Sequence, residues 1–170
     1  MKTINSICII GGGTAGWMSA AFLYNKNPKL KITIVDKEIG TPVSVGEATI
    51  LNFGSFMDQC GFDSAEWFSS IDATYKSGIL FPDWVEEGKD VWHPFFMNPT
   101  LDSGETSHDA WCKNKDLDFV EYALPMYYNS MENKVDKNEI GAYGFQIDCG
   151  KLVEYLRKKL DNKITYIPSE

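Results

Sequence analysis

The stretch INSICIIGGGTAGW, residues 4–17, joins a short aliphatic run to a cluster of glycines and decides how the chain begins to fold. Residues 4–10 have the profile of a strand that is buried on both faces in a parallel sheet. Apolar side chains recur at helical spacing over residues 14–25, and residues 31–36, KITIVD, have the pattern of a second strand. The opening is therefore predicted to be a βαβ unit, with a right-handed crossover between its two strands.

The glycines of this unit form the pattern GxGxxG. Gly11 allows a tight turn, Gly13 lets the backbone approach a pyrophosphate, and Gly16 permits close packing of the helix on the strand. The pyrophosphate would bind the free amides at the positive end of the helix, and Asp36 at the end of the second strand would accept hydrogen bonds from ribose hydroxyls. The glycine pattern, the strand before it, the helix after it and the acidic residue at the end of the second strand all have the spacing of a dinucleotide site. Together they predict such a site rather than glycines that serve only a turn. The acid argues against NADP, but the motif does not distinguish FAD from NAD.

The middle of the chain is less regular. We expect a loop after the second strand, short helices near 51–60 and 64–70, with a cap before the second of these, and a strand over 76–84. Residues 85–115 are rich in Pro, Gly and aromatic side chains and lack any sustained period, so the region near 81–111 is interpreted as an aromatic-rich insertion.

The last part of the chain has a clear pattern again. Asp148 is a good N-cap for a helix with an apolar stripe of Leu152, Leu156 and Leu160, and residues 163–167 resemble a following strand. No repeat or linker divides the sequence. Residues 1–170 are therefore expected to form one domain, without a separate second domain.

Composition narrows the function classes. A formal net charge of −8 repels nucleic acid, so neither DNA nor RNA is expected as a partner. The four cysteines are scattered, without the spacing of metal ligands, and fit reduced thiols. The apolar stretch near the N-terminus is too short for a signal or membrane segment. We expect a cytoplasmic protein with no metal and no membrane association.

Five segments, in this order, resemble the N-terminal part of the flavin-dependent tryptophan halogenase family. They are GGGTAGWMSA (11–20), SVGEATI (44–50), DATYKSGILFPDW (72–84), WHPFF (92–96) and YGFQIDCGKLVEYLRKKL (143–160). SVGEATI followed by the lysine-containing segment is fairly specific to the family, whereas the glycine pattern is shared with most flavoprotein monooxygenases. The resemblance implies an α/β fold, namely a Rossmann-type, flavoprotein monooxygenase-like FAD-binding fold, which would be incomplete in 170 residues.

The resemblance also implies a reaction. Family members use reduced FAD supplied by a separate flavin reductase, oxygen, and chloride or bromide to halogenate tryptophan or another indole-like aromatic substrate. The family's catalytic lysine matches Lys76, which would receive hypochlorous acid by a hydrogen bond or as a chloramine. On sequence grounds alone Lys76 is an ordinary lysine, and most lysines are solvated surface charges.

Other site residues follow from the same match. His93 and Phe95 fall at positions that line the substrate pocket, although a structural histidine and core packing are equally good interpretations. Ala48 is expected to touch the flavin, and Glu47 is a second candidate there, or a carboxylate that merely caps a turn. The residues expected to bind the cofactor are Gly11, Gly13, Thr14, Ala15, Gly16, Asp36 and Ala48.

The family's GWxWxIP motif is not found in the sequence. The chain is therefore expected to be the front part of a halogenase, or one piece of a split enzyme completed by a second chain, and to be inactive alone. Two alternatives remain: a flavoprotein hydroxylase, which would have no use for Lys76, and a noncatalytic module that binds a nucleotide or a partner. The module would use exposed aromatic side chains, namely Trp84, Trp92, Phe95, Phe96 and Trp111.

Overall fold

The structure is a computed structural model in which the chain divides into two compact units. The first unit comprises Met1–Thr74 together with Gln146–Glu170, and the second comprises Tyr75–Phe145. The expectation of no separate second domain stays a prediction. The structure describes residues 3–37, 46–96, 100–101, 103–113, 115–116, 118–123, 127–132, 134, 136, 138 and 141–169.

The first unit contains the predicted βαβ opening. Strand β1 (Ser6–Ile10) leads into helix α1 (Thr14–Lys26) and strand β2 (Lys31–Lys37), and β1 pairs with β2 in parallel. Helix α7 (Cys149–Leu160) leads into β8 (Thr165–Ser169), which pairs in parallel with the other side of β2. The sheet order is β1-β2-β8. The mixed α/β fold expected from the sequence is confirmed.

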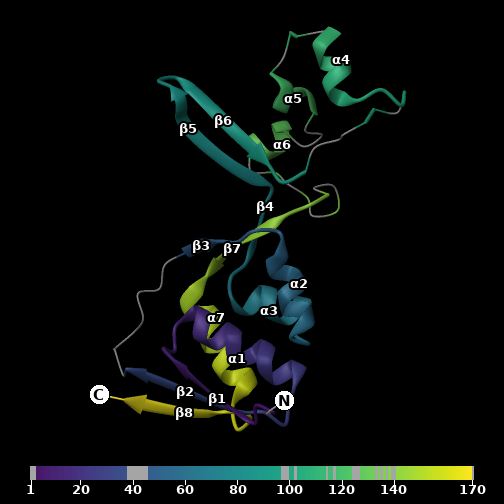
Figure 1. The fold of residues 1–170 in the computed structure, drawn as a ribbon. Coiled ribbons are helices and arrows are strands. Elements are labelled where there is room, and N and C mark those ends of the chain that lie inside the picture. The colour runs from purple at the N-terminus through teal and green to yellow at the C-terminus, as the bar shows by residue number, and fades with distance from the viewer. Residues whose placement is uncertain are drawn as a thin grey trace. The chain divides into compact units, whose positions relative to one another are not determined.

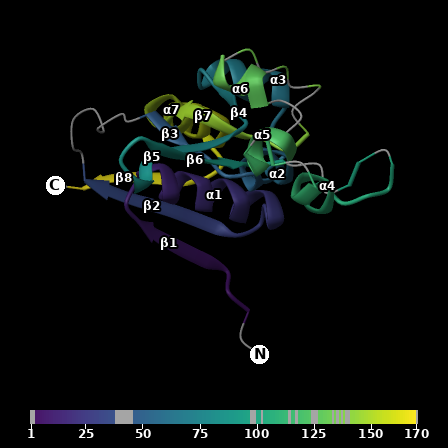
Figure 2. The ribbon, with the colours of Figure 1, turned by 90° about the horizontal axis from the view of Figure 1, so that it is seen from above.

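Two helices cover this sheet on one face. In Figures 1 and 2, α1 and α7 lie on the same face of the sheet. Ile32 and Ile34 of β2 are 2% and 0% exposed, and Leu152 and Leu156 of α7 are both fully buried. The helical leucine stripe predicted from the sequence therefore packs into the core of the first unit.

Strand β1 differs from the prediction that both of its faces are buried. Its side chains alternate between exposed and half-buried, and Ile10 is 79% exposed. The physical reason is its position at the edge of the described sheet, whose second face carries no helix among the described residues. The aliphatic run correctly predicted the strand but not the exposure of its side chains.

Shorter elements complete the first unit. They are β3 (Gly46–Ala48), α2 (Asn52–Gln59) and α3 (Ser64–Ser70), and the boundary between the units falls within β4 (Thr74–Lys76) and β7 (Gly144–Asp148). Strands β3 and β7 pair in an antiparallel manner, and the strand order is β3-β7-β4.

Both predicted helix caps form. The Asp63 carboxylate accepts a hydrogen bond of 2.9 Å from the Glu66 amide at the start of α3, and Asp148 accepts one of 2.9 Å from the Lys151 amide at the start of α7. Asp148 therefore satisfies a backbone donor that would otherwise have no partner within the helix.

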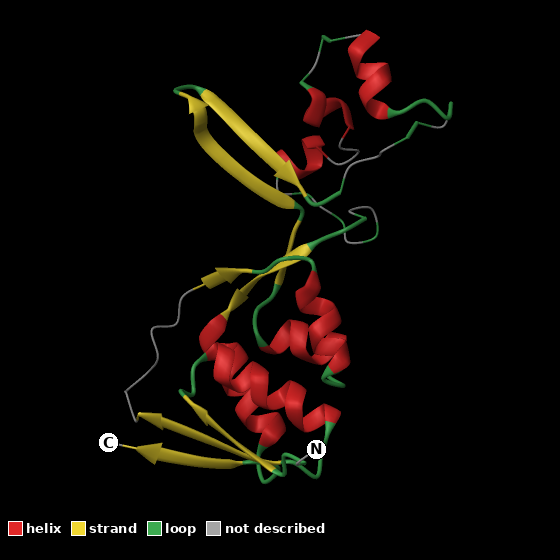
Figure 3. Ribbon diagram, in the orientation of Figure 1, coloured by secondary structure: helices red, strands yellow, loops and turns green. Residues whose placement is uncertain are grey.

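The second unit contains a hairpin that the sequence analysis did not predict, while the interpretation of residues near 81–111 as an aromatic-rich insertion stays a prediction. Strand β5 (Gly78–Glu86) pairs with strand β6 (Lys89–Pro94) in an antiparallel hairpin, followed by α4 (Ser107–Lys113), α5 (Phe119–Ala123) and α6 (Tyr127–Met131) (Figure 3). The register is irregular between Phe81 and Glu86, which breaks the two-residue alternation by which a strand is recognised.

The aromatic side chains that were expected to be exposed differ in how much of their surface is exposed. Trp84 is 70% exposed on the hairpin, whereas Trp92, Phe95, Phe96 and Trp111 are only partly exposed. These five residues thus do not all present exposed rings. Across the part of the chain that the structure describes, no helix is both long and apolar enough to cross a membrane.

Candidate functional site

The glycine turn between β1 and α1 has the backbone geometry expected of a dinucleotide site. Gly11 has a φ of 106°, a conformation that side chains other than glycine rarely adopt, and its amide donates a 2.8 Å hydrogen bond to the Val35 carbonyl. A Cβ on Gly16 would overlap the Gly11 carbonyl oxygen. The turn therefore requires glycine at these two positions for reasons internal to the protein.

Gly13 is different because nothing in the described protein requires it. Its φ is −75°, which any residue can adopt, and a Cβ there would meet no atom within 4 Å. It stands at the N-cap of α1, whose first turn carries no acidic residue and no side-chain cap. Free amides at a positive helix end, approached without hindrance, fit the pyrophosphate of a dinucleotide. Thr14 and Ala15 are the next two residues, in the first turn of α1.

Asp36 lies directly against the glycine turn. A Cβ on Gly12 would come within 2.7 Å of the Asp36 Cγ, and it would overlap one carboxylate oxygen. The second glycine of GGG, to which the GxGxxG pattern gives no role, therefore makes room for the carboxylate predicted to bind ribose. The residues of the turn and Asp36 together fit the ADP half of a dinucleotide.

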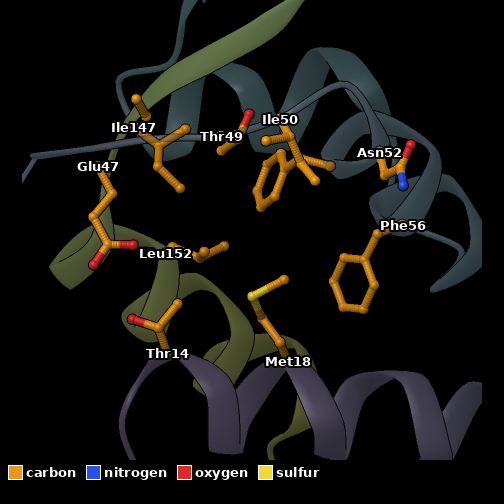
Figure 4. Close-up of a pocket in the computed structure, with 11 residues that line it drawn as sticks. Thr14, Met18, Glu47, Thr49, Ile50, Asn52, Phe56, Ile147 and Leu152 are labelled. Atoms are coloured by element: carbon orange, nitrogen blue, oxygen red, sulfur yellow. The ribbon is translucent and has the colours of Figure 1, made fainter.

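A cavity of about 400 Å³ lies beside the first turn of α1. Figure 4 shows its apolar side chains, among them Met18, Phe56 and Leu152, around the central space, with Thr14 and Glu47 together on one side. Ala48, expected to contact a flavin, also lines it. The full lining is Thr14, Met18, Glu47, Ala48, Thr49, Ile50, Asn52, Phe53, Phe56, Ile147 and Leu152. Two residues of SVGEATI, Ser44 and Val45, lie outside the described residues.

Sequence reasoning missed one residue at this place, Cys149. The Cys149 side chain is only 6% exposed, at the start of α7. Burial raises the pKa of the Cys149 thiol to about 11, its contacts with the Glu47 carboxylate raise the pKa as well, and the Thr14 hydroxyl acts in the opposite direction. The only sequence signal was its place directly after the N-cap Asp148.

Three other predicted residues come together in the second unit. The Nζ of Lys76 lies 5.1 Å from the centroid of the Phe95 ring. The His93 and Phe95 ring centroids are 6.3 Å apart with the planes at 80°. The pairing of β5 with β6 places His93 opposite Ile79, and the Phe95 amide donates a 2.8 Å hydrogen bond to the Ser77 carbonyl next to Lys76.

The surroundings of Lys76 change its acid–base chemistry. The side chain is half-buried, and burial lowers the pKa of its ammonium group from the ordinary value. A lysine in this setting is a better nucleophile at neutral pH than a solvated one, and its ammonium form still donates hydrogen bonds. Phe95 is half-buried and His93 is exposed, so neither is a fully packed core residue.

The tryptophan halogenase family model matches residues 6–164 of the chain. Among curated proteins, tryptophan 6-halogenase SttH of Streptomyces toxytricini is 37% identical over 122 residues, which is 69% of this chain and 23% of SttH. Tryptophan 6-halogenase ThaL of Streptomyces albogriseolus is 28% identical over 91% of this chain and 34% of its own length.

The fold has the same relatives among solved structures. Xcc4156, a flavin-dependent halogenase from Xanthomonas campestris, superposes with a TM-score of 0.84 at 30% identity, over 99% of this chain and 36% of that chain. The SttH crystal structure superposes with a TM-score of 0.81 over 98% of this chain and 35% of its own. The chain thus spans about a third or less of the length of these relatives. On the match over residues 6–164, the chain belongs to the tryptophan halogenase family.

Proposed function

We propose that this protein binds FAD through its glycine turn and takes part in the flavin-dependent halogenation of tryptophan or another indole-like aromatic compound. The observation that carries the proposal is the half-buried Lys76 against Phe95, in a chain that belongs to the tryptophan halogenase family. The names of relatives such as SttH and Xcc4156 support both halogenation and a flavin requirement.

The cofactor would be held by groups of the first unit. Amides at the N-terminus of α1, from Gly13 to Ala15, would bind the pyrophosphate, and Asp36 would accept hydrogen bonds from the adenosine ribose. Ala48 and the cavity that it lines would bind the flat, less polar flavin portion of FAD. Reduced FAD would supply the electrons with which oxygen is activated to oxidise chloride or bromide.

Lys76 would act on the oxidised halide. Its ammonium group can donate a hydrogen bond to the oxygen of hypochlorous acid and so make the chlorine more electrophilic. Alternatively its free amine and hypochlorous acid give a chloramine and water, and the lowered pKa makes that amine more available. His93 and Phe95 would hold an aromatic substrate beside the lysine, since flat rings stack or meet edge to face.

The partners follow from this reaction. Beyond the aromatic substrate and a halide, the protein would need a separate flavin reductase to supply reduced FAD, and a second chain that completes the fold stays one possible partner. The hydroxylase alternative is not favoured by the comparisons, in which the relatives are halogenases. The net charge of −8 argues against a nucleic-acid partner.

The test combines binding with product analysis. FAD and ADP are titrated calorimetrically into the protein, which is then incubated with tryptophan, a flavin reductase, oxygen, and chloride or bromide. Product carrying the added halide, identified by mass spectrometry, is expected only when residues 1–170 are combined with the rest of a halogenase, since they are expected to be inactive alone. A hydroxylated product that forms without halide would assign the protein to the hydroxylases. FAD binding without any product, even when residues 1–170 are combined with the rest of a halogenase, would favour the nucleotide-binding module.

A further inference from the structure

Strand β1 has the sequence of an interior strand but lies at an edge. Its residues, SICII, include no charged side chain and no proline, whereas edge strands of natural sheets usually carry such residues, which prevent pairing with other chains. At the opposite edge, β8 contains Pro168, and proline in a sheet is largely confined to edge strands. Figure 2 shows β1 at one side of the sheet, where β2 is its only neighbour among the described strands. The two sequences therefore mark β8, but not β1, as a natural edge strand.

The main chain of β1 has hydrogen-bonding groups on the side away from β2. The Asn5 carbonyl and the Gly11 amide both form hydrogen bonds with residues of β2, at 3.1 Å and 2.8 Å. Main-chain groups alternate in direction along a strand, so those of Ser6, Cys8 and Ile10 point away from β2. No described strand lies on that side. The edge can therefore pair with one further strand.

The face of the sheet opposite α1 and α7 carries a row of apolar side chains. The parallel register aligns Ile10 with Val35 and Val35 with Ile167, so these three side chains lie side by side on one face. Ile34, next to Val35, is fully buried on the helix-covered face, which places the row on the other face. Ile10 is 79% exposed and Ile167 is 46% exposed. A parallel sheet normally buries such a face beneath a second layer, and the described residues provide none here.

The relatives contain enough additional chain to cover both surfaces. Xcc4156 superposes on 99% of this chain with only 36% of its own length, so roughly two thirds of Xcc4156 lies outside the shared region. In the doubly wound dinucleotide fold the strand order is 3-2-1-4-5-6, so the first strand is interior. The order β8-β2-β1 corresponds to the 3-2-1 half of that sheet. The partner that fits the free side of β1 is therefore the other half of such a sheet.

We propose that the free edge of β1 and the row of Ile10, Val35 and Ile167 form one docking surface for the remaining part of a halogenase. That part adds a parallel strand beside β1 and an apolar layer over the row. The inference names a partner for the proposed function and so rests on it. The carboxyl ends of parallel strands share one edge of a sheet, so the added strand ends beside the glycine turn. The partner thereby contributes to the cofactor site as well as to the core.

The first test is amide hydrogen exchange, measured by NMR on isotope-labelled residues 1–170. The chain is studied alone and as a complex co-expressed with the unlabelled part of Xcc4156 that lies outside the shared region. Alone, the amides of Ile7 and Ile9, which point to β2, should exchange slowly, and those of Cys8 and Ile10 should exchange rapidly. In the complex, exchange at Cys8 and Ile10 should slow by at least about tenfold.

The second test is copurification of the two parts with substituted chains. Ile167→Asp places a charge beneath the added layer, and Cys8→Pro places a ring at the free edge, so each should reduce the copurified partner by at least about tenfold. Val85→Asp is the matched control, because Val85 is 72% exposed in the second unit, and it should copurify as the wild type does. Thermal midpoints within about 2 °C of the wild type would show that the isolated variants are folded.

Three results would overturn the inference. They are the absence of a complex with the wild-type chain, wild-type copurification by both Ile167→Asp and Cys8→Pro, and protection of Cys8 and Ile10 that rises with the concentration of the chain alone. The last result would show that the surface joins two copies of this chain. A complex that forms as expected but yields no halogenated product would instead contradict the proposed function and leave the docking surface supported.

Discussion

The ammonium nitrogen of Lys76 lies 5.1 Å from the centroid of the Phe95 ring, across the base of the β5–β6 hairpin. The ring has two opposing effects on the lysine. Its face attracts the cation by about 0.5–1 kcal/mol at an exposed site, while its bulk excludes water and disfavours the charge. Burial lowers the pKa of Lys76 from its ordinary value, and we expect the exclusion of water by the Phe95 ring to contribute to this shift.

Removing the Phe95 ring is therefore expected to raise the pKa of Lys76. In Phe95→Ala the ammonium regains water, and its pKa should rise toward that of an ordinary lysine, whereas Phe95→Leu keeps an apolar cover and should leave it low. The pH dependence of Lys76 acetylation, followed by mass spectrometry of the peptide, measures this. Phe81→Ala, on the same hairpin but packed against Trp84, serves as the control. A lower pKa in Phe95→Ala would show that the cation–π attraction dominates.

Changes at Lys76 should separate chemistry from cofactor binding. When residues 1–170 are combined with the rest of a halogenase, Lys76→Ala is expected to reduce halogenated product by at least about a hundredfold, the lower range for a positioned acid–base group, with FAD affinity unchanged. The reason is that the glycine turn lies in the other unit. Product is quantified by mass spectrometry and FAD binding by calorimetry.

Lys76→Arg distinguishes the two roles proposed for the lysine. Guanidinium stays protonated, so it cannot form a chloramine but can still donate hydrogen bonds. Loss of product in this variant would favour the chloramine, and partial retention would favour the hydrogen bond. Product at the wild-type level from Lys76→Ala would show that the residue is not catalytic.

The glycine turn and the helix caps were predictable because their signals are local. Gly11, Gly16 and Asp36 all lie within the first two strands and the helix between them, so spacing alone gives their roles. Asp63 and Asp148 each accept a hydrogen bond from an amide three residues later, which is again a short-range pattern.

What escaped prediction depends on pairing between distant segments. Glu47 lies opposite Ile147, two residues before Cys149, only because β3 pairs with β7, and no periodicity in the sequence predicts that register. Strand β6 was not predicted because apolar and polar residues do not alternate regularly in its sequence, KDVWHP. Its pairing with β5 is also irregular. The cofactor, substrate and cytoplasmic location inferred for the whole protein stay predictions.

The contact between Gly12 and Asp36 gives a test of ribose recognition. Asp36→Ala should weaken ADP binding by roughly tenfold, because a charged acceptor is lost. Gly12→Ala should do the same by displacing the carboxylate, and it should add little once Asp36 is alanine, since the two changes act on one group. Asp58→Ala, at an exposed position of α2, controls for net charge. Additive losses from Gly12→Ala and Asp36→Ala would refute this coupling.

Substitutions of Gly13 and Gly16, at the start of α1, are expected to have different effects on stability. A Cβ on Gly16 overlaps the Gly11 carbonyl oxygen, so Gly16→Ala must shift the helix from the strand, at about 1–3 kcal/mol and several degrees of thermal midpoint. Gly13→Val meets nothing within 4 Å and has an ordinary φ, so the fold should tolerate it and the midpoint should stay within about 2 °C.

The Gly13→Val variant, although stable, is expected to lose nucleotide binding. The Gly13→Val side chain occupies the space through which a pyrophosphate would approach the α1 amides, so ADP and FAD titrations should show no binding by a protein that is still folded. Differential scanning calorimetry and titration on the same preparations measure both properties. If Gly13→Val bound ADP as the wild type does, the open space at Gly13 would not be the pyrophosphate site. Stability lost at Gly13 but kept at Gly16 would mean that the turn has a different geometry, because only Gly16 is crowded by its own backbone.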